Sequence, residues 1–239
     1  MSRTILPFQI AGQHIDYRLI RRTRQKHINI RVSHTGEIVV SAPIHTSGDK
    51  INEAVRLRAK WVESHVLQIR ELRMGISELA AFPINGKLFH VEIVKSDGIR
   101  DRVKICHNES IICLSSPVED RARHMIAVKR ALVRNAAQQV KPEVEAFARC
   151  AGVPITRTFI RDQRTRWGSS SVRRNISLNW RVFMAPSTVR QYLIYHELAH
   201  QLHMNHSPAF WTQVETWCPG YGRWDKWLKK HSYLLGLFR

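Results

Sequence analysis

Long apolar runs are missing from this chain. No apolar run approaches the roughly 18–20 residues that cross a bilayer, which argues against a membrane partner. The first residues, from Met1 to Phe8, contain neither a long apolar stretch nor a small-residue cleavage site, so export is not expected. The cysteines form no Cys-x-x-Cys pair, which is typical of buried, reduced thiols. They are Cys106, Cys113, Cys150 and Cys218. We therefore expect a cytoplasmic protein.

Acidic residues are also scarce, since 19 stand against 38 basic residues and the net charge is +19. The basic residues are spread through the chain, so a disordered basic tail does not explain the excess. Such a surface should attract polyanions, such as nucleic acid or nucleotides. A basic surface can also serve solubility alone, and net charge identifies no partner. Both interpretations stay open.

Residues 196–200 read His-Glu-Leu-Ala-His. On a helix, His196 and His200 lie one turn apart on the same face, where both can hold one tetrahedral zinc ion. Glu197 projects about 100° around the helix from His196. Its carboxylate would lie beside the metal and accept a proton from an activated water without being a ligand. The alternative is a chance match on a helix with two exposed histidines.

The residues before this motif favour a buried helix over the chance match. Pro186 precedes the segment, and Ser187 or Thr188 is expected to be its N-cap. Val189 and Leu193 then continue an apolar stripe towards the two histidines, so both imidazoles are expected to point inward.

Two residues compete to be the third metal ligand. His203 is seven residues after His196, and three ligands in a row along one helix cannot surround a tetrahedral ion. His206 comes after the expected end of the helix, where Asn205 can turn the chain back. Ser207 and Pro208 then provide an N-cap and a first residue for a new helix. The geometry favours His206.

Several separated motifs occur in one order along residues 120–230. They are Arg166-Trp167-Gly168-Ser169-Ser170, Ile176-Ser177-Leu178-Asn179, Pro186, the 196–200 motif, and Asn205-His206-Ser207 with Phe210-Trp211. In these motifs the chain closely resembles the YgjP-like metallopeptidase family, which is similar to SprT-like and other small gluzincin-type peptidase domains. The resemblance implies that His196, His200 and His206 bind zinc and that Glu197 is the catalytic base. Ser170 departs from it, because many relatives carry cysteine there.

The periodicity of the chain predicts an α+β fold, with a β-rich amino-terminal part before a small zincin-like metallopeptidase domain. We place a soft boundary at residue 80, which gives regions 1–80 and 81–239. The expected strands are a hairpin over 28–40 with a turn at 34–36, then 87–95, 102–106, 110–114, 155–160 and 176–180. The expected helices cover 49–73, ending near Gly75, and 119–151, which Pro142 can kink or divide, besides the two at the motif.

The chemistry of the motif predicts a zinc-dependent metallopeptidase that acts on a peptide or protein. Residues 176–180, or the turn before them, are candidates to pair with an extended substrate. Arg166 could hold a carboxylate or a polarised oxygen, and Trp167 could wall the pocket, although packing is the commoner use of such a tryptophan. Tyr192, Tyr195, His203 and Arg166 are the candidates to stabilise the oxyanion. The alternatives are a zinc-dependent nucleotide phosphohydrolase and a nucleic-acid-binding module with structural zinc.

Overall fold

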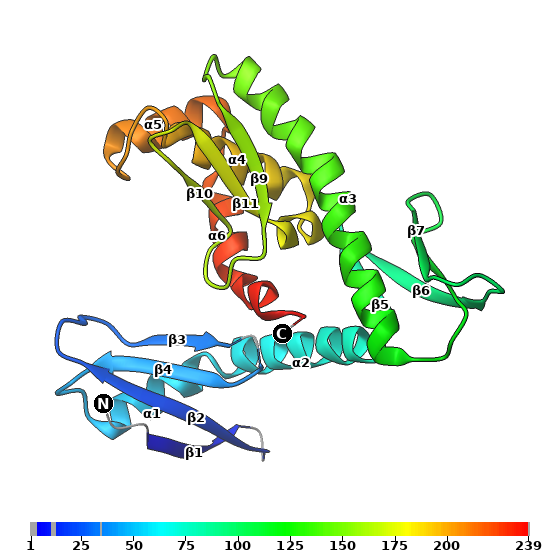
Figure 1. Ribbon diagram of the computed structural model, residues 1–239. Coiled ribbons are helices and arrows are strands. Elements are labelled where there is room, and N and C mark those ends of the chain that lie inside the picture. The colour runs from blue at the N-terminus through cyan, green and yellow to red at the C-terminus, as the bar shows by residue number, and fades with distance from the viewer. Residues whose placement is uncertain (1–3, 11–12, 34, 239) are drawn as a thin grey trace. The chain divides into compact units, whose positions relative to one another are not determined.

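The computed structural model describes residues 4–10, 13–33 and 35–238 (Figure 1). The chain forms two compact units, residues 1–74 and 75–239. Helices and sheets occur in both units, which confirms the expected mixed α+β class. His34, in the expected turn at 34–36, lies outside the described residues.

The first unit contains a four-stranded sheet in the order β1-β2-β4-β3. Its strands are β1 (Thr4–Ile10), β2 (Gln13–Arg22), β3 (Asn29–Val32) and β4 (Ile38–Pro43). β3 and β4 pair antiparallel, as the expected hairpin requires. Tyr17 and Leu19 alternate into the core from β2, where they meet the buried side chains of Val40 and Ile51.

The single helix expected over 49–73 is two helices, α1 (Gly48–Leu57) and α2 (Ala59–Ser77). Arg58 leaves the helical conformation, with φ −109° and ψ 12°, although no glycine or proline marks the break. The interruption allows Val55 of α1 and Val62 of α2 to pack in one core cluster. A sequence pattern with helical spacing on both sides could not locate this break.

The end of α2 also differs from the expectation, because Gly75 remains helical. The residue in the left-handed conformation is Leu79, with φ 57°. Hydrogen bonds from Leu79 N to Ile76 O and from Ala80 N to Gly75 O complete a Schellman motif around it. Leu79 is buried, so packing offsets the strain that glycine would avoid.

The second unit contains two sheets. One has the order β5-β6-β8-β7, with β5 (Ala81–Ile84), β6 (Lys87–Lys95), β7 (Arg102–Cys106) and β8 (Ile111–Ser116). The other has the order β10-β11-β9, with β9 (Arg157–Arg161), β10 (Gly168–Ser170) and β11 (Asn175–Asn179). The strands expected at 87–95, 102–106 and 110–114 are confirmed, whereas Trp180 begins a 3-10 helix instead of ending a strand.

α3 (Arg121–Cys150) is the long helix between the two sheets in sequence, and it contacts both of them (Figure 1). The side chain of Asp120 caps its start by accepting a hydrogen bond from Arg123 N. Pro142 lies inside the helix and does not divide it. Val140 and Val144, on either side of this proline, are fully buried.

The remaining elements surround the candidate site. They are η1 (Trp180–Met184), α4 (Ser187–Ala199), α5 (Pro208–Trp217), α6 (Gly222–Lys230) and η2 (Ser232–Gly236). α4 begins with Pro186 in the N-cap position and without a side-chain cap, so the expected capping by Ser187 or Thr188 is wrong. Within the described part of the chain, no helix is long and apolar enough to cross a membrane.

Candidate active site

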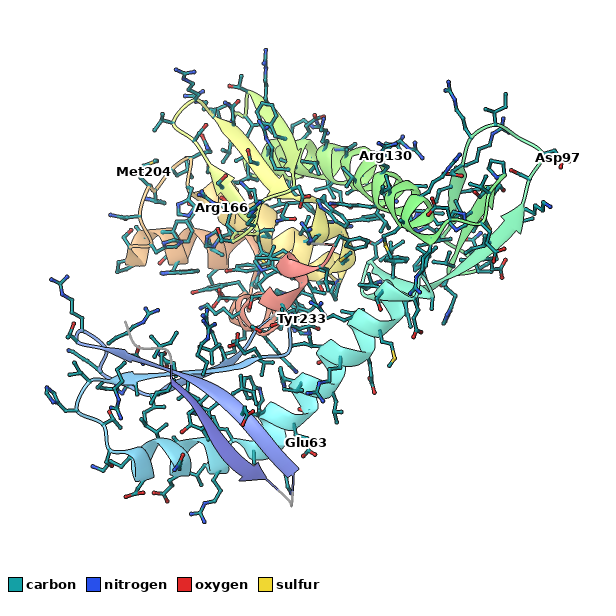
Figure 2. The ribbon with its side chains drawn as sticks, turned by 60° about the horizontal axis from the view of Figure 1, so that its bottom comes forward. Glu63, Asp97, Arg130, Arg166, Met204 and Tyr233 are labelled. Atoms are coloured by element: carbon teal, nitrogen blue, oxygen red, sulfur yellow. The ribbon has the colours of Figure 1, made fainter. Side chains whose placement is uncertain are left out.

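Three histidines converge at the carboxyl end of α4. His196 lies in the last turn of the helix, His200 is its C-cap, and His206 is in the loop before α5, a loop that Met204 marks in Figure 2. One ring nitrogen of each histidine lies within 4.8 Å of the others. The Nε2 atoms of His196 and His206 are 3.2 Å apart. This is the arrangement expected for His206 as the third member.

The local sequence explains why the three imidazoles meet. Val189 and Leu193 anchor the buried face of α4, two turns and one turn before His196. Ser207 caps α5 by accepting a hydrogen bond from Phe210 N, which fixes the direction of the chain directly after His206.

His203 contributes its backbone and not its ring to this cluster. Its carbonyl oxygen lies 3.1 Å from His200 Nδ1, so Nδ1 carries the proton and donates it. The unprotonated nitrogen of His200 is then Nε2. The His203 ring is absent from the group of candidate ligands found among the described residues.

A second contact orients His196. Tyr192 Oη donates a hydrogen bond to Asp225 Oδ1 over 3.2 Å and lies 3.4 Å from His196 Nδ1. Because the single hydroxyl proton goes to Asp225, the tyrosine oxygen accepts from the Nδ1–H group of His196. This tautomer leaves the Nε2 lone pair directed to the other two histidines.

The pKa values of the two helical histidines favour their neutral forms. Burial, together with the charges of His200 and His206, lowers the pKa of His196 to about 3. Burial also lowers the pKa of His200, against the opposing hydrogen bond to the His203 carbonyl. Neutral imidazole is the form that binds a metal ion, so both residues are ready to be ligands at neutral pH.

Glu197 is a buried carboxyl group beside this cluster, with 5% of its surface exposed. Burial raises its pKa to about 8, and the positive charge of Arg166 opposes that rise. No described residue donates a hydrogen bond to its carboxylate. A carboxyl group with a pKa near neutrality can both accept and return a proton during a reaction.

Gly168, the first residue of β10, provides the space for this carboxylate. A Cβ atom at residue 168 would lie 2.8 Å from Glu197 Cδ and closer still to Oε1. Any side chain there would therefore displace the carboxyl group.

Arg166 is exposed in the segment that leads into β10 (Figure 2). Its backbone oxygen accepts a hydrogen bond from Asn179, which fixes the segment. No acidic side chain in the described part of the chain forms an ion pair with it. Its charge acts on Glu197, so Arg166 is the cation of this site that can still bind a substrate group.

Trp167 and Tyr195 serve packing in this structure. Trp167 packs against the hydrophobic core, and its Nε1 donates to Leu228 O over 3.3 Å. Tyr195 is buried between Phe147 and Trp217, with ring centroids 5.0 and 5.8 Å away. Neither ring stacks on a histidine of the cluster.

Phe210 supports the cluster from α5. Its ring centroid lies 5.0 Å from that of His196, 4.6 Å from His200 and 4.8 Å from His206. Trp211 stacks on His206 at 5.4 Å and on Tyr221 at 5.1 Å. These aromatic rings limit the freedom of the three imidazoles.

This donor set fits a zinc ion. Three imidazoles are a known protein ligand set for catalytic zinc, and such sites leave a fourth position for water or substrate. The hydrogen bonds to His196 and His200 fix the ring nitrogens that face one another. His196, His200 and His206 could therefore hold the metal, with Glu197 beside it.

Two residues of the site escaped sequence analysis. Asp225 is 19 residues beyond His206 and belongs to a different helix, α6, so no spacing connects it with the histidines. Gly168 belongs to the motif at residues 166–170, but the need for a glycine there is visible only in the fold, where it adjoins Glu197.

Comparison with known proteins adds one finding. The family model described as YgjP-like, metallopeptidase domain, matches residues 26–231. No curated protein and no solved structure matches the chain.

Proposed function

Since the chain belongs to the YgjP-like metallopeptidase domain family, we propose that it is a zinc-dependent peptidase with His196, His200 and His206 as ligands. The observations that support this most directly are the three converging imidazole nitrogens and the buried carboxyl group of Glu197, the residue directly after His196. A purely structural zinc site is normally closed by a fourth protein ligand and has no use for such a group.

Zinc, when bound, supplies a Lewis acid that polarises the scissile carbonyl and lowers the pKa of water. Glu197 takes the proton of the attacking water at a carboxylate oxygen and delivers it to the leaving amine nitrogen. The second step regenerates the carboxylate. The burial of Glu197 limits access of competing water, and the absence of a side chain at Gly168 leaves room for its carboxyl group.

Substrate binding is assigned to the edge strand β10. β11 has a neighbour on each side, β10 and β9, so residues 176–179 have no free edge for a substrate. β10 pairs with β11 alone and begins at Gly168, beside Glu197. An extended peptide that adds to β10 would receive main-chain hydrogen bonds without a demand for particular side chains.

Arg166 is the residue we assign to the developing negative charge of the substrate. The hydroxyl group of Tyr192 already bonds to Asp225 and His196, and the ring of Tyr195 is in the core. The Arg166 side chain forms no ion pair with a described residue, and its charge acts on Glu197, the carboxylate that moves the proton. Its guanidinium group can donate two parallel hydrogen bonds to an oxyanion or a carboxylate.

The first experiment compares wild type with Glu197→Gln on a peptide library and on a panel of nucleoside triphosphates. We expect peptide cleavage to fall by about 10²-fold or more in the variant while the zinc content stays the same, because general acid–base catalysis contributes about that much. Glu109→Gln, an exposed change of the same kind, is the matched control. Cleavage that persists in zinc-loaded Glu197→Gln contradicts the mechanism.

The same samples distinguish the alternatives. Cleavage of nucleotides alone would support a phosphohydrolase, and zinc binding without either activity would support a binding module with structural zinc. Zinc content in His206→Ala and His203→Ala tests the ligand set. We expect loss of zinc in the first and retention in the second, because His203 acts through its backbone oxygen.

We further propose a cytoplasmic location, supported by four free cysteines among the described residues. The peptide or protein substrate follows from the family, and its sequence preference is open to the library experiment.

A further inference from the structure

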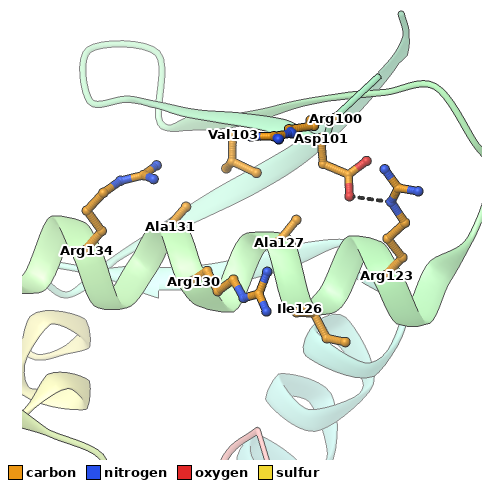
Figure 3. Close-up of a pocket in the computed structure, with 9 residues that line it drawn as sticks. All are labelled: Arg100, Asp101, Val103, Arg123, Ile126, Ala127, Arg130, Ala131 and Arg134. Atoms are coloured by element: carbon orange, nitrogen blue, oxygen red, sulfur yellow. Dashed lines mark hydrogen bonds and ion pairs between the residues drawn. The ribbon is translucent and has the colours of Figure 1, made fainter. Parts of the chain in front are cut away.

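A basic cavity of about 510 Å³ lies between α3 and the strand β7, within the second unit (Figure 3). Four arginines line it: Arg100, Arg123, Arg130 and Arg134. Asp101 is the single acidic residue of the lining, so the cavity has an excess of three positive charges. None of the residues that we assign to zinc or to substrate lines this cavity.

The spacing along α3 explains how the arginines gather. Arg130 and Arg134 follow Arg123 by seven and eleven residues, which places all three within roughly 40° of one another around a helix. Arg100 approaches from the opposite side, from the loop before β7 (Figure 3). Between them, Val103, Ala127 and Ala131 form a small apolar floor.

Arg123 is held in position for a ligand. Asp101 Oδ2 accepts a hydrogen bond from Arg123 Nε over 2.7 Å, and Asp101 Oδ1 accepts one from Ser116 Oγ over 2.7 Å. The pKa of Asp101 is lowered by these two hydrogen bonds, so it stays ionised. Because the ion pair uses Nε, the two terminal amino groups of Arg123 remain available.

The other three arginines have no acidic partner in the part of the chain that the structure describes. Neighbouring basic residues on α3 do have partners, since Lys129 pairs with Asp162 and Arg121 bonds to the carbonyl of Ser77. Lys129 and Arg121 therefore differ from Arg130 and Arg134, which line the cavity without an acidic partner among the described residues. Clustered cations without counter-charges are typical of a binding site for a multiply charged anion.

We propose that this cavity binds adjacent phosphate groups, carried by a nucleotide or by a nucleic-acid strand. Arginine is suited to this ligand because its planar fork donates two hydrogen bonds to phosphate oxygens. The volume falls within the range of roughly 300–1,000 Å³ found for small-molecule sites. The site is separate from the proposed peptidase centre, so it goes beyond the proposed function.

The test measures binding of inorganic triphosphate, adenosine triphosphate and a labelled single-stranded oligonucleotide at low salt. The variant is Arg130→Ala with Arg134→Ala, since both side chains are exposed and alanine preserves the helix. We expect binding of the phosphate probes to weaken by roughly tenfold or more for each arginine, the effect of a charge-assisted hydrogen bond. For a bound strand, the salt slope should also fall by about 0.7 for each lost contact.

The matched control is Lys141→Ala with Arg149→Ala, which removes two positive charges from the same helix outside this cavity. If the oligonucleotide binds more strongly than triphosphate, nucleic acid is the source of the phosphates. If adenosine triphosphate binds more tightly than the oligonucleotide and displaces it, the ligand is a nucleotide. Equal weakening in both double variants, or no binding of any probe by the wild type, overturns the proposal.

Discussion

At the scale of single residues, the candidate site requires a residue without a side chain, Gly168, as well as the histidines and Glu197. Glu197 is enclosed, and the Cα of Gly168 forms one wall of its surroundings. The role of Glu197 could be predicted from the sequence, because it follows from helical spacing relative to His196. The role of Gly168 could not, since its contact joins β10 to α4, two elements that are brought together only by the fold.

Gly168→Ala tests this contact. The added methyl group would meet the Glu197 carboxyl group, which has to shift while the three histidines stay in place. A displacement of about 1 Å in a catalytic group can lower a rate by roughly 10²-fold. We expect peptide hydrolysis to fall by about this factor with the zinc content unchanged, as measured by steady-state kinetics and metal analysis.

Gly222→Ala is the matched control, because a Cβ atom at residue 222 has no neighbour within 4 Å. It should hydrolyse peptides at the rate of the wild type. An equally active Gly168→Ala enzyme would show that Glu197 does not need its present position.

At the scale of elements, α4 is fixed by a buried arginine in its first turn, at the end opposite the histidines. Arg190 is 3% exposed and forms a bidentate pair with Glu143 of α3, with N–O distances of 2.6 and 2.7 Å. Its Nη1 also donates to Asn85 Oδ1, in the turn between β5 and β6, over 2.6 Å. One side chain thus connects α4 with a helix and a sheet.

Glu143→Ala should leave Arg190 charged and without its partner. Loss of one member of a buried ion pair lowers the free energy of unfolding by about 3–5 kcal/mol. Because solvent reaches part of Glu143, we expect a loss of about 2 kcal/mol here. That corresponds to a fall in Tm of roughly 4–8 °C for a unit of this size. Glu145→Ala, an exposed change on the same helix, should shift the Tm little. Calorimetry on the two variants decides whether the pair stabilises α4.

The elements also show which sequence signals are sufficient. Strands β6 and β7 lie at the bounds that the periodicity of the sequence predicted for them. β5 was missed, although Asn85-Gly86 is a strong hairpin signal and both residues have positive φ. The break at Arg58 has no local signal, since it depends on how two helices pack on one sheet.

At the scale of the whole molecule, basic residues outnumber acidic ones, so few carboxylates are present to pair with buried cations. Arg181 is completely buried, donates to Leu237 O near the end of the chain, and pairs with Asp162 at 2.5 Å. Burial acts to raise the pKa of Asp162, but the hydrogen bond and charge of Arg181, helped by Lys129, outweigh it and lower the pKa to about 2.

This lowered pKa gives the stability a defined dependence on pH. Asp162 binds its proton more weakly in the folded state than in the unfolded state, where its pKa is 3.8. The carboxylate therefore stabilises the fold fully above about pH 4, and this contribution disappears as the pH falls to about 2. Other carboxyl groups titrate over the same range, so the measured quantity is the difference in unfolding free energy between wild type and Asp162→Asn. We expect urea denaturation to show a constant difference from about pH 7 to 5 and a difference that becomes smaller below about pH 4.

For the control Glu109→Gln, at an exposed site, the difference in unfolding free energy from the wild type should not become smaller at low pH. A difference that stays constant down to about pH 2 would mean that Asp162 acts through its shape and not through its charge, because only the charge is lost on protonation.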